Sequence, residues 1–172
     1  SKEIPVVLCF NKKDIASQPE LKELQEIYSA CGYRVIFTSA LNEENIGTVK
    51  EVLLGKTTVI AGPSGVGKSS LINLLQTEIR METGSISKKI ARGKHTTRHS
   101  ELITIDGSSY IMDTPGFSSL YVNDFEKGEL KYYIREFAPY EGKCRFNGCD
   151  HVHEPGCAVK AAVEHGEIHT VR

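Results

Sequence analysis

An apolar run, "KTTVIAG" at residues 56–62, leads directly into "GPSGVGKSS" and then into the helix-like "LINLLQ". The spacing G-x-x-x-x-G-K-[ST] is met by Gly62, Gly67, Lys68 and Ser69. Glycines let the backbone wrap an anion with its N–H groups pointing inward, and the helix N-terminus adds a partial positive charge. The pattern predicts a phosphate-binding loop in which Lys68 reaches the β- and γ-phosphates and Ser69 ligates Mg²⁺. Its expected members are Gly62, Pro63, Ser64, Gly65, Val66, Gly67, Lys68, Ser69 and Ser70.

A second motif, "FNKKD", follows another apolar run, "IPVVLCF", near the start of the chain. Asp14 can accept hydrogen bonds from guanine N1–H and the exocyclic amine, whereas adenine would leave the carboxylate unpaired. Asn11 can brace this site, and the stem of Lys12 can cover the base. In "TSA", after the next predicted strand, the backbone of Ser39 and Ala40 can meet guanine O6. We therefore expect GTP rather than ATP.

Two further stretches fit the parts of a nucleotide site that respond to the γ-phosphate. "DTPG" follows the strand-like "YIM", so that Asp113 can hold Mg²⁺ through its water shell and the Gly116 N–H can meet the γ-phosphate. In "GKHTTR", Thr97 is the first choice for a switch threonine on Mg²⁺, and Thr96 is the second. The expected Mg²⁺ ligands are Ser69, Thr97 and Asp113.

These motifs run in the order base, base, phosphate, switch, switch, whereas conventional GTPases begin with the phosphate loop. The order predicts a circularly permuted P-loop GTPase fold of the α/β class, with a largely parallel sheet. Helices are expected at 19–32, 43–54, 68–76, 125–137 and 157–165, and a hairpin at 100–116. The unpermuted fold has one more strand and helix between "DTPG" and "NKKD". Because lack of that central strand would expose two sheet edges, we expect a longer natural chain.

A cysteine cluster, "CRFNGCDHVHEPGC", follows the predicted GTPase part. Cys144, Cys149, His151 and Cys157 supply three thiolates and one imidazole, the donor set of a closed structural Zn²⁺ site. His153 is the rival imidazole, and three free thiols are the alternative interpretation. The expected organisation is a GTPase domain at 1–122 and a small helical zinc-binding domain at 123–172.

Composition adds little that is specific to one function. The net charge of −1 gives no overall basic field, although residues 80–100 carry six basic side chains against Glu82 alone. That run can meet nucleic-acid phosphates or simply form a solvated loop. Since no apolar run approaches the length of a membrane span and "SKEIPVV" lacks a signal-peptide pattern, we expect a soluble, cytoplasmic protein without a membrane partner.

The permuted order together with C-x4-C-x-H-x5-C closely resembles the RsgA (YjeQ/YloQ) family of GTPases that mature the small ribosomal subunit. "NKKD", "TSA", "GPSGVGKSSLIN", "GKHTTR", "DTPGF" and "GCAVKAAVEHGEI" carry the resemblance along nearly the whole chain. It implies an N-terminal OB-fold, which has no counterpart here, and a zinc domain that is cut short at Arg172. It also implies a monomer that binds the small subunit and its 16S rRNA, with GTP hydrolysis stimulated by that subunit.

The sequence offers one candidate within the chain for the group that orients the attacking water. Phe117 stands where Ras-like enzymes have a water-orienting Gln, so we expect slow hydrolysis by the protein alone. Within the chain, His95 is the candidate to orient the water, with Lys68 and Thr97 on the phosphates and Mg²⁺. A group supplied by the ribosome is the rival. The alternative function is a GTP-responsive RNA- or ribosome-binding module with little catalysis, and "NKKD" argues against an ATPase or kinase.

Overall fold

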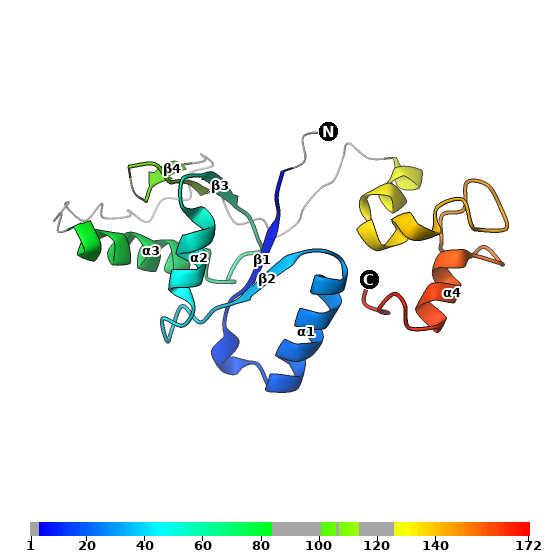
Figure 1. Cartoon of the computed structure of the whole chain (residues 1–172), viewed down its shortest axis with the longest axis horizontal. Coiled ribbons are helices and arrows are strands. Elements are labelled where there is room, and N and C mark those ends of the chain that lie inside the picture. The colour runs from blue at the N-terminus through cyan, green and yellow to red at the C-terminus, as the bar shows by residue number, and fades with distance from the viewer. Residues whose placement is uncertain (1–3, 84–100, 106, 114–125) are drawn as a thin grey trace. The chain divides into compact units, whose positions relative to one another are not determined.

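The computed structural model describes residues 4–83, 101–105, 107–113 and 126–172. Helices and strands alternate along the first part of the chain, and short helices fill the rest (Figure 1). In chain order the elements are β1 (Val7–Phe10), η1 (Lys13–Ile15), α1 (Gln18–Ala30), β2 (Arg34–Phe37), α2 (Ile46–Leu53), β3 (Thr57–Ile60), α3 (Lys68–Thr83), β4 (Glu101–Thr104), β5 (Tyr110–Asp113), η2 (Lys127–Tyr133), η3 (Arg135–Tyr140) and α4 (Ala158–Glu164).

The strands form two small sheets. β1 lies parallel to β2, from Val7 opposite Arg34 to Phe10 opposite Phe37. In the other sheet β5 is central, parallel to β3 and antiparallel to β4. The parallel pairings and the β4–β5 hairpin agree with the sequence prediction. Within the described ranges, β1 and β3 each pair with a single neighbour.

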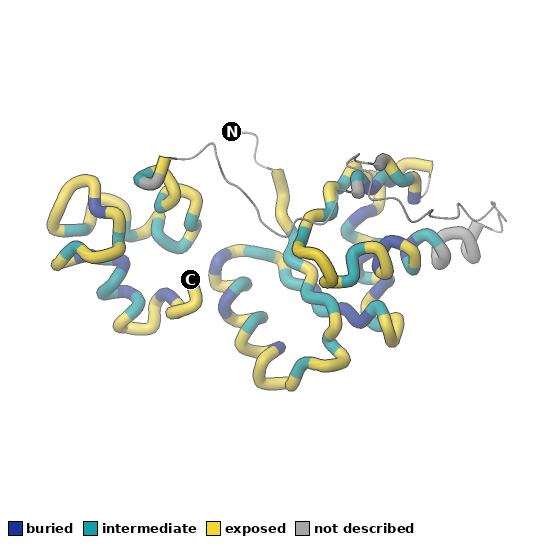
Figure 2. The backbone as a smooth tube through the Cα atoms, turned by 180° about the vertical axis from the view of Figure 1, so that it is seen from behind, coloured by how far each residue is buried: buried dark blue, intermediate teal, exposed yellow. Residues whose placement is uncertain are grey.

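One apolar core unites both sheets with α2 and α3. Figure 2 shows that buried stretches of the backbone, in dark blue, alternate with exposed ones along the chain. In α2, the buried residues Ile46, Val49 and Leu53 recur at helical spacing on one face. They join Ile36 of β2 and Ile111 of β5, and Leu71, Ile72 and Leu75 of α3 complete the same cluster. This packing fixes the start of α3, and with it the phosphate loop, against the ends of the strands.

Residues 23–33 form a second compact unit with residues 126–172, separate from the unit that holds the strands. Its core contains Cys149, Cys157, Val159, Ala162 and Ile168. The predicted helix at 157–165 is present as α4. The predicted helix at 125–137 is instead two 3₁₀ helices, η2 and η3. Ile134 between them is extended (φ −92°, ψ 102°), and Pro139 has no N–H to donate.

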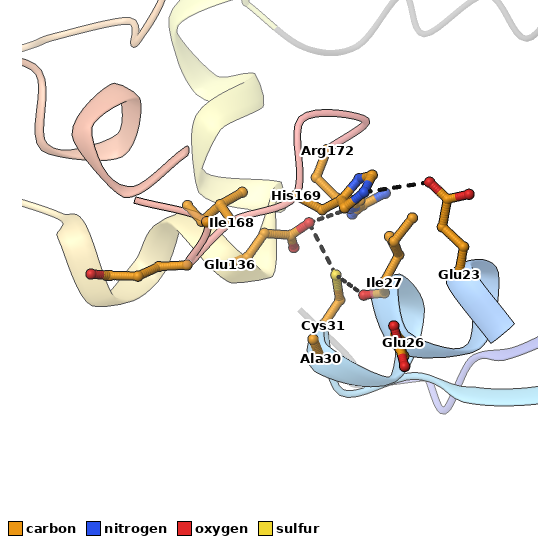
Figure 3. A pocket seen from close by; sticks show the side chains of 11 residues that line it. Glu23, Glu26, Ile27, Ala30, Cys31, Glu136, Ile168, His169 and Arg172 are labelled. Atoms are coloured by element: carbon orange, nitrogen blue, oxygen red, sulfur yellow. Dashed lines mark hydrogen bonds and ion pairs between the residues drawn. The ribbon is translucent and has the colours of Figure 1, made fainter. Parts of the chain in front are cut away.

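A partly buried polar contact joins Cys31, directly after α1, to Glu136 of η3 inside this unit (Figure 3). The Cys31 thiol donates to Glu136 Oε1 at 3.2 Å, and Arg172 Nε donates to the same oxygen. Nearby, His169 Nε2 lies 3.6 Å from Glu23 Oε1. These side chains line a pocket of about 240 Å³. Among the described residues, Glu136 Oε2 is buried without a hydrogen-bond partner.

Across the described parts of the chain, helices are too short or too polar to cross a membrane.

Candidate nucleotide-binding site and metal centre

The phosphate loop lies between β3 and the first turn of α3, as the strand–loop–helix pattern predicts. Gly65 (φ +81°) and Gly67 (φ +92°) adopt left-handed conformations that side chains disfavour. The Leu71 N–H donates to the Gly67 carbonyl at 3.0 Å, which starts the helix at the end of the loop. Lys68 Nζ donates to the carbonyls of Gly62 at 2.7 Å and Pro63 at 2.8 Å. The lysine therefore stays within the loop, close to the backbone N–H groups that can hold phosphate.

The ends of β1 and β2 are joined just where the base-reading residues begin. The Thr38 N–H donates to the Phe10 carbonyl at 2.8 Å, and the Lys13 N–H donates back to the Thr38 carbonyl at 2.9 Å. Lys12 lies between these contacts in a left-handed conformation (φ +69°) with an exposed side chain. The two loops thus form one rigid platform at the carboxyl ends of parallel strands, where ligands of α/β proteins bind.

Asn11 connects this platform to the phosphate loop. Its Nδ2 donates to the Val66 carbonyl at 2.9 Å. Its Oδ1 accepts from the Ala40 N–H at 3.0 Å and from the Thr38 hydroxyl at 3.2 Å. A Cβ built on Gly67 would collide with Nδ2, so a side chain at that position would displace the Asn11 amide from its hydrogen bonds.

Asp14 is held by the second base loop. The Ser39 hydroxyl, which is fully buried, donates to Asp14 Oδ1 at 2.5 Å and accepts from the Asn42 N–H at 3.1 Å. Lys13 Nζ lies 2.8 Å from Glu44 Oε2, and this ion pair joins the same two loops. The Asp14 residue itself is exposed. A carboxylate fixed in this way can accept hydrogen bonds from a base that enters the site.

The switch residues are only partly visible. Register places Asp113 opposite Ile60, so that the strand end of "DTPG" lies beside the strand that enters the phosphate loop. The Ser69 residue is exposed at the start of α3. The Asp113 side chain and five expected residues of the switches lie outside the described residues: His95, Thr96, Thr97, Gly116 and Phe117.

The cysteine cluster converges on one point in the second unit. Ligand atoms of Cys144, Cys149, His151 and Cys157 all lie within 4.8 Å of one another. Cys144 Sγ is 4.0 Å from Cys157 Sγ, and His151 Nδ1 is 3.3 Å from Cys157 Sγ. A tetrahedral site with Zn–S bonds of about 2.3 Å has ligand–ligand edges of about 3.8 Å. The donor set and spacing therefore fit Zn²⁺, whereas His153 lies outside the cluster.

Backbone N–H groups support the cluster from outside. The N-terminus of α4 donates from Ala158 to Cys144 Sγ at 3.3 Å and from Lys160 to Cys157 Sγ at 3.4 Å. Although burial raises the pKa of Cys144, the N–H groups of Ala158 and Val159 and the neighbouring thiols hold it below its ordinary value. Burial raises the pKa of Cys149 to about 11. Metal binding would then release a proton from Cys149, so affinity for the ion depends on pH.

Some supporting residues were not found by sequence reasoning. Glu154 accepts the N–H groups of Asp150, Val152 and His153 and holds the loop between two ligands. These donors lower the pKa of Glu154 to about 2. In the sequence, the one feature that pointed to this role was the position of Glu154 between the metal ligands His151 and Cys157. Thr38 was visible in "TSA", but its hydroxyl contact with Asn11 depends on how two loops meet.

A phosphate loop at the head of α3 and a guanine-type base loop that precedes it in sequence define a circularly permuted P-loop GTPase domain. The chain belongs to the RsgA GTPase family, whose model matches residues 1–123.

Individual relatives agree with this assignment. The Small ribosomal subunit biogenesis GTPase RsgA of Agathobacter rectalis is 56% identical over 169 residues, which are 98% of this chain and 56% of the relative. That of Clostridium perfringens is 48% identical over 170 residues, 99% of this chain and 59% of the relative.

Solved structures show the same fold. YjeQ from Thermotoga maritima has a TM-score of 0.77 and 40% identity, covering 99% of this chain and 56% of that one. YloQ, described as a circularly permuted GTPase, has a TM-score of 0.70 and 35% identity, covering 96% and 52%. The chain thus spans little more than half the length of these relatives.

Proposed function

We propose that this chain is the GTP-binding and GTP-hydrolysing part of a factor in late maturation of the small ribosomal subunit, and that the subunit stimulates its activity. The contact of Asn11 with both the Val66 carbonyl and the Ala40 N–H carries the nucleotide part, because it brings base-reading and phosphate-binding loops into one site. The printed names of the relatives support the ribosomal part.

In this proposal each loop has a separate task. Asp14 accepts the N1–H and exocyclic amine of guanine, and Lys12 covers the base. The backbone of Ser39 and Ala40 meets O6. The N–H groups of residues 62–70 cradle the phosphates, and Lys68 turns from its loop carbonyls to the β- and γ-phosphates.

Ser69, Thr97 and Asp113 would hold Mg²⁺, with Thr96 as the second choice for the switch threonine. An ion held there would supply neutralisation of the charge on the phosphates. Because Phe117 cannot orient that water, His95 is assigned this role, with a ribosomal group as the rival. The Gly116 N–H meets the γ-phosphate. Loss of that phosphate would release both switches and let the factor leave the subunit.

The second unit serves as a metal-stapled binding module in the proposal. Cys144, Cys149, His151 and Cys157 would hold a structural Zn²⁺ ion, which stabilises a segment with few apolar residues of its own. We propose that the domains run from 1 to 122 and from 123 to 172 along the sequence, with residues 23–33 of the first domain grouped in the second compact unit. We further propose that the protein acts as a cytoplasmic monomer on 16S rRNA.

GTP turnover, measured with and without purified small ribosomal subunits, tests this function. We expect slow turnover alone and strong stimulation by subunits, both abolished in Lys68→Ala. His95→Ala should keep GTP affinity and lose stimulation, and retained stimulation would assign the water-orienting group to the ribosome. If GTP binds but subunits never stimulate turnover, the chain is a GTP-responsive binding module and the hydrolytic proposal is wrong.

A further inference from the structure

A hollow of about 390 Å³ lies in the second unit, and Cys144, Cys149 and His151 of the cysteine cluster form part of its lining. Its lining includes two aromatic side chains from different segments, Tyr132 of η2 and Phe146 of the cysteine loop. Both are well exposed, at 63% and 46%. Phe137 also lines the hollow and packs edge-on against His151, with ring centroids 5.4 Å apart. The hollow is thus lined by aromatic rings on one part and by proposed metal ligands on another.

Cations accompany the exposed rings. Arg145 lies over Phe146 at 5.4 Å from the ring centroid, and Lys131 lies over Tyr132 at 5.4 Å. Lys131 is also bonded to the Cys149 carbonyl at 2.9 Å and lies 3.4 Å from Asp150. Arg145 has no carboxylate partner among the described residues. Its charge is therefore available to a phosphate next to the hollow.

The remaining polar groups suit the edge of a nucleobase. Asn147 lines the hollow and, within the described parts of the chain, its side-chain amide makes no hydrogen bond. It offers both a donor and an acceptor at one place. Glu141 is the single carboxylate in the lining, and Lys143 next to the hollow lies over Tyr140 at 5.9 Å.

We propose that this hollow binds one unpaired nucleotide of RNA. The base stacks on Tyr132 and Phe146, the Asn147 amide hydrogen-bonds to its edge, and Arg145 with Lys143 contacts the adjoining phosphates. Exposed aromatic rings with neighbouring cations are the usual platform for single-stranded nucleic acid, and a duplex cannot present a base in this way. The inference rests on the proposed role at the ribosomal subunit and assigns it a local binding site.

The test uses the zinc-loaded chain and a short single-stranded oligoribonucleotide that carries 2-aminopurine, whose fluorescence falls when the base stacks. We expect quenching on binding, and about 5- to 100-fold weaker affinity in Tyr132→Leu and in Phe146→Leu. Phe146→Tyr should retain quenching because it keeps the ring. Tyr133→Leu is the matched control, since Tyr133 is exposed at 58% next to Tyr132 but does not line the hollow.

Charge variants separate phosphate contact from stacking. Arg145→Gln should reduce the slope of the logarithm of the binding constant against the logarithm of the salt concentration by about 1, the value of one phosphate contact. Glu141→Gln should strengthen RNA binding, because it removes a negative charge from the hollow. Equal affinity of the two leucine variants and the Tyr133→Leu control, or equal affinity of wild type for a duplex of the same sequence, would refute the proposal. If those results appear while subunits still stimulate GTP turnover, the site is refuted and the proposed function stands.

Discussion

The Asn11 amide bonds to three different loop positions of the candidate nucleotide site. We predict that Asn11→Ala weakens GDP binding by about 30- to 100-fold, since up to three hydrogen bonds of roughly 1 kcal/mol each are lost. Titration calorimetry with GDP measures the change. Asn42→Ala is the control, because the hydrogen bond of Asn42 to Ser39 comes from its backbone. Equal GDP affinities for Asn11→Ala and Asn42→Ala would contradict the role of the Asn11 side chain in joining the loops.

Gly67 gives a second prediction at the residue scale. Gly67→Ala should lose at least about 10-fold more GDP affinity than Gly65→Ala. Both positions have positive φ and share the strain of a side chain there, but only a Cβ at Gly67 meets Asn11 Nδ2, while that at Gly65 meets open space. Asn11→Ala should then weaken GDP binding less in the Gly67→Ala variant than in the wild type, because the effects of substitutions at two contacting residues are not additive. Fully additive losses would show that the collision is irrelevant.

At the scale of elements, Glu136 should hold η3 against α1. Burial raises the pKa of this carboxyl, but the hydrogen bonds from Arg172, the backbone and Cys31, together with the charge of Arg172, outweigh burial and keep the pKa below its ordinary value of 4.5. We predict that Glu136→Ala lowers the free energy of unfolding by about 2 kcal/mol, less than for a fully buried pair because Arg172 is partly exposed. Glu164→Ala, at the exposed end of α4, should change it by less than about 0.5 kcal/mol.

The same contact should depend on pH. Because the native pKa is depressed, the contribution of Glu136 is present above 4.5 and disappears as pH falls through the native value. The difference in melting temperature between wild type and Glu136→Ala should therefore be constant near neutrality and shrink below pH 4.5. A difference that grows on acidification would contradict this assignment.

The cysteine loop yields a prediction about metal. We expect the chain to bind about one equivalent of Zn²⁺, and Cys157→Ser to lose it along with the structure of residues 144–164. Cys31→Ser is the control, since Cys31 contacts Glu136 and lies outside the cluster. Metal analysis and circular dichroism report the result. Unchanged zinc content in Cys157→Ser would exclude the tetrahedral set.

Elements that depend on local patterns could be predicted from sequence, and contacts between distant segments could not. Apolar runs and turn glycines indicated the strands and α3, and the motif placed Asn11 near the base. Its partner, the Val66 carbonyl, is a backbone group that every residue type carries, so sequence gave no sign of it. The contact between Cys31 and Glu136 joins residues that are 105 positions apart. The break at Ile134 was missed because no Gly or Pro marks it in residues 129–137.

For the whole molecule, the central claim is that two loops in permuted order form one guanine site. The direct measurement is the affinity of wild type and Asp14→Asn for GDP and for xanthosine diphosphate. Xanthine carries a carbonyl in place of the exocyclic amine, so it suits an amide that both donates and accepts, and Ser39 can still donate to Oδ1. We predict that wild type prefers GDP by about 10³-fold or more and that Asp14→Asn reverses the preference. An unchanged preference in Asp14→Asn would contradict the account.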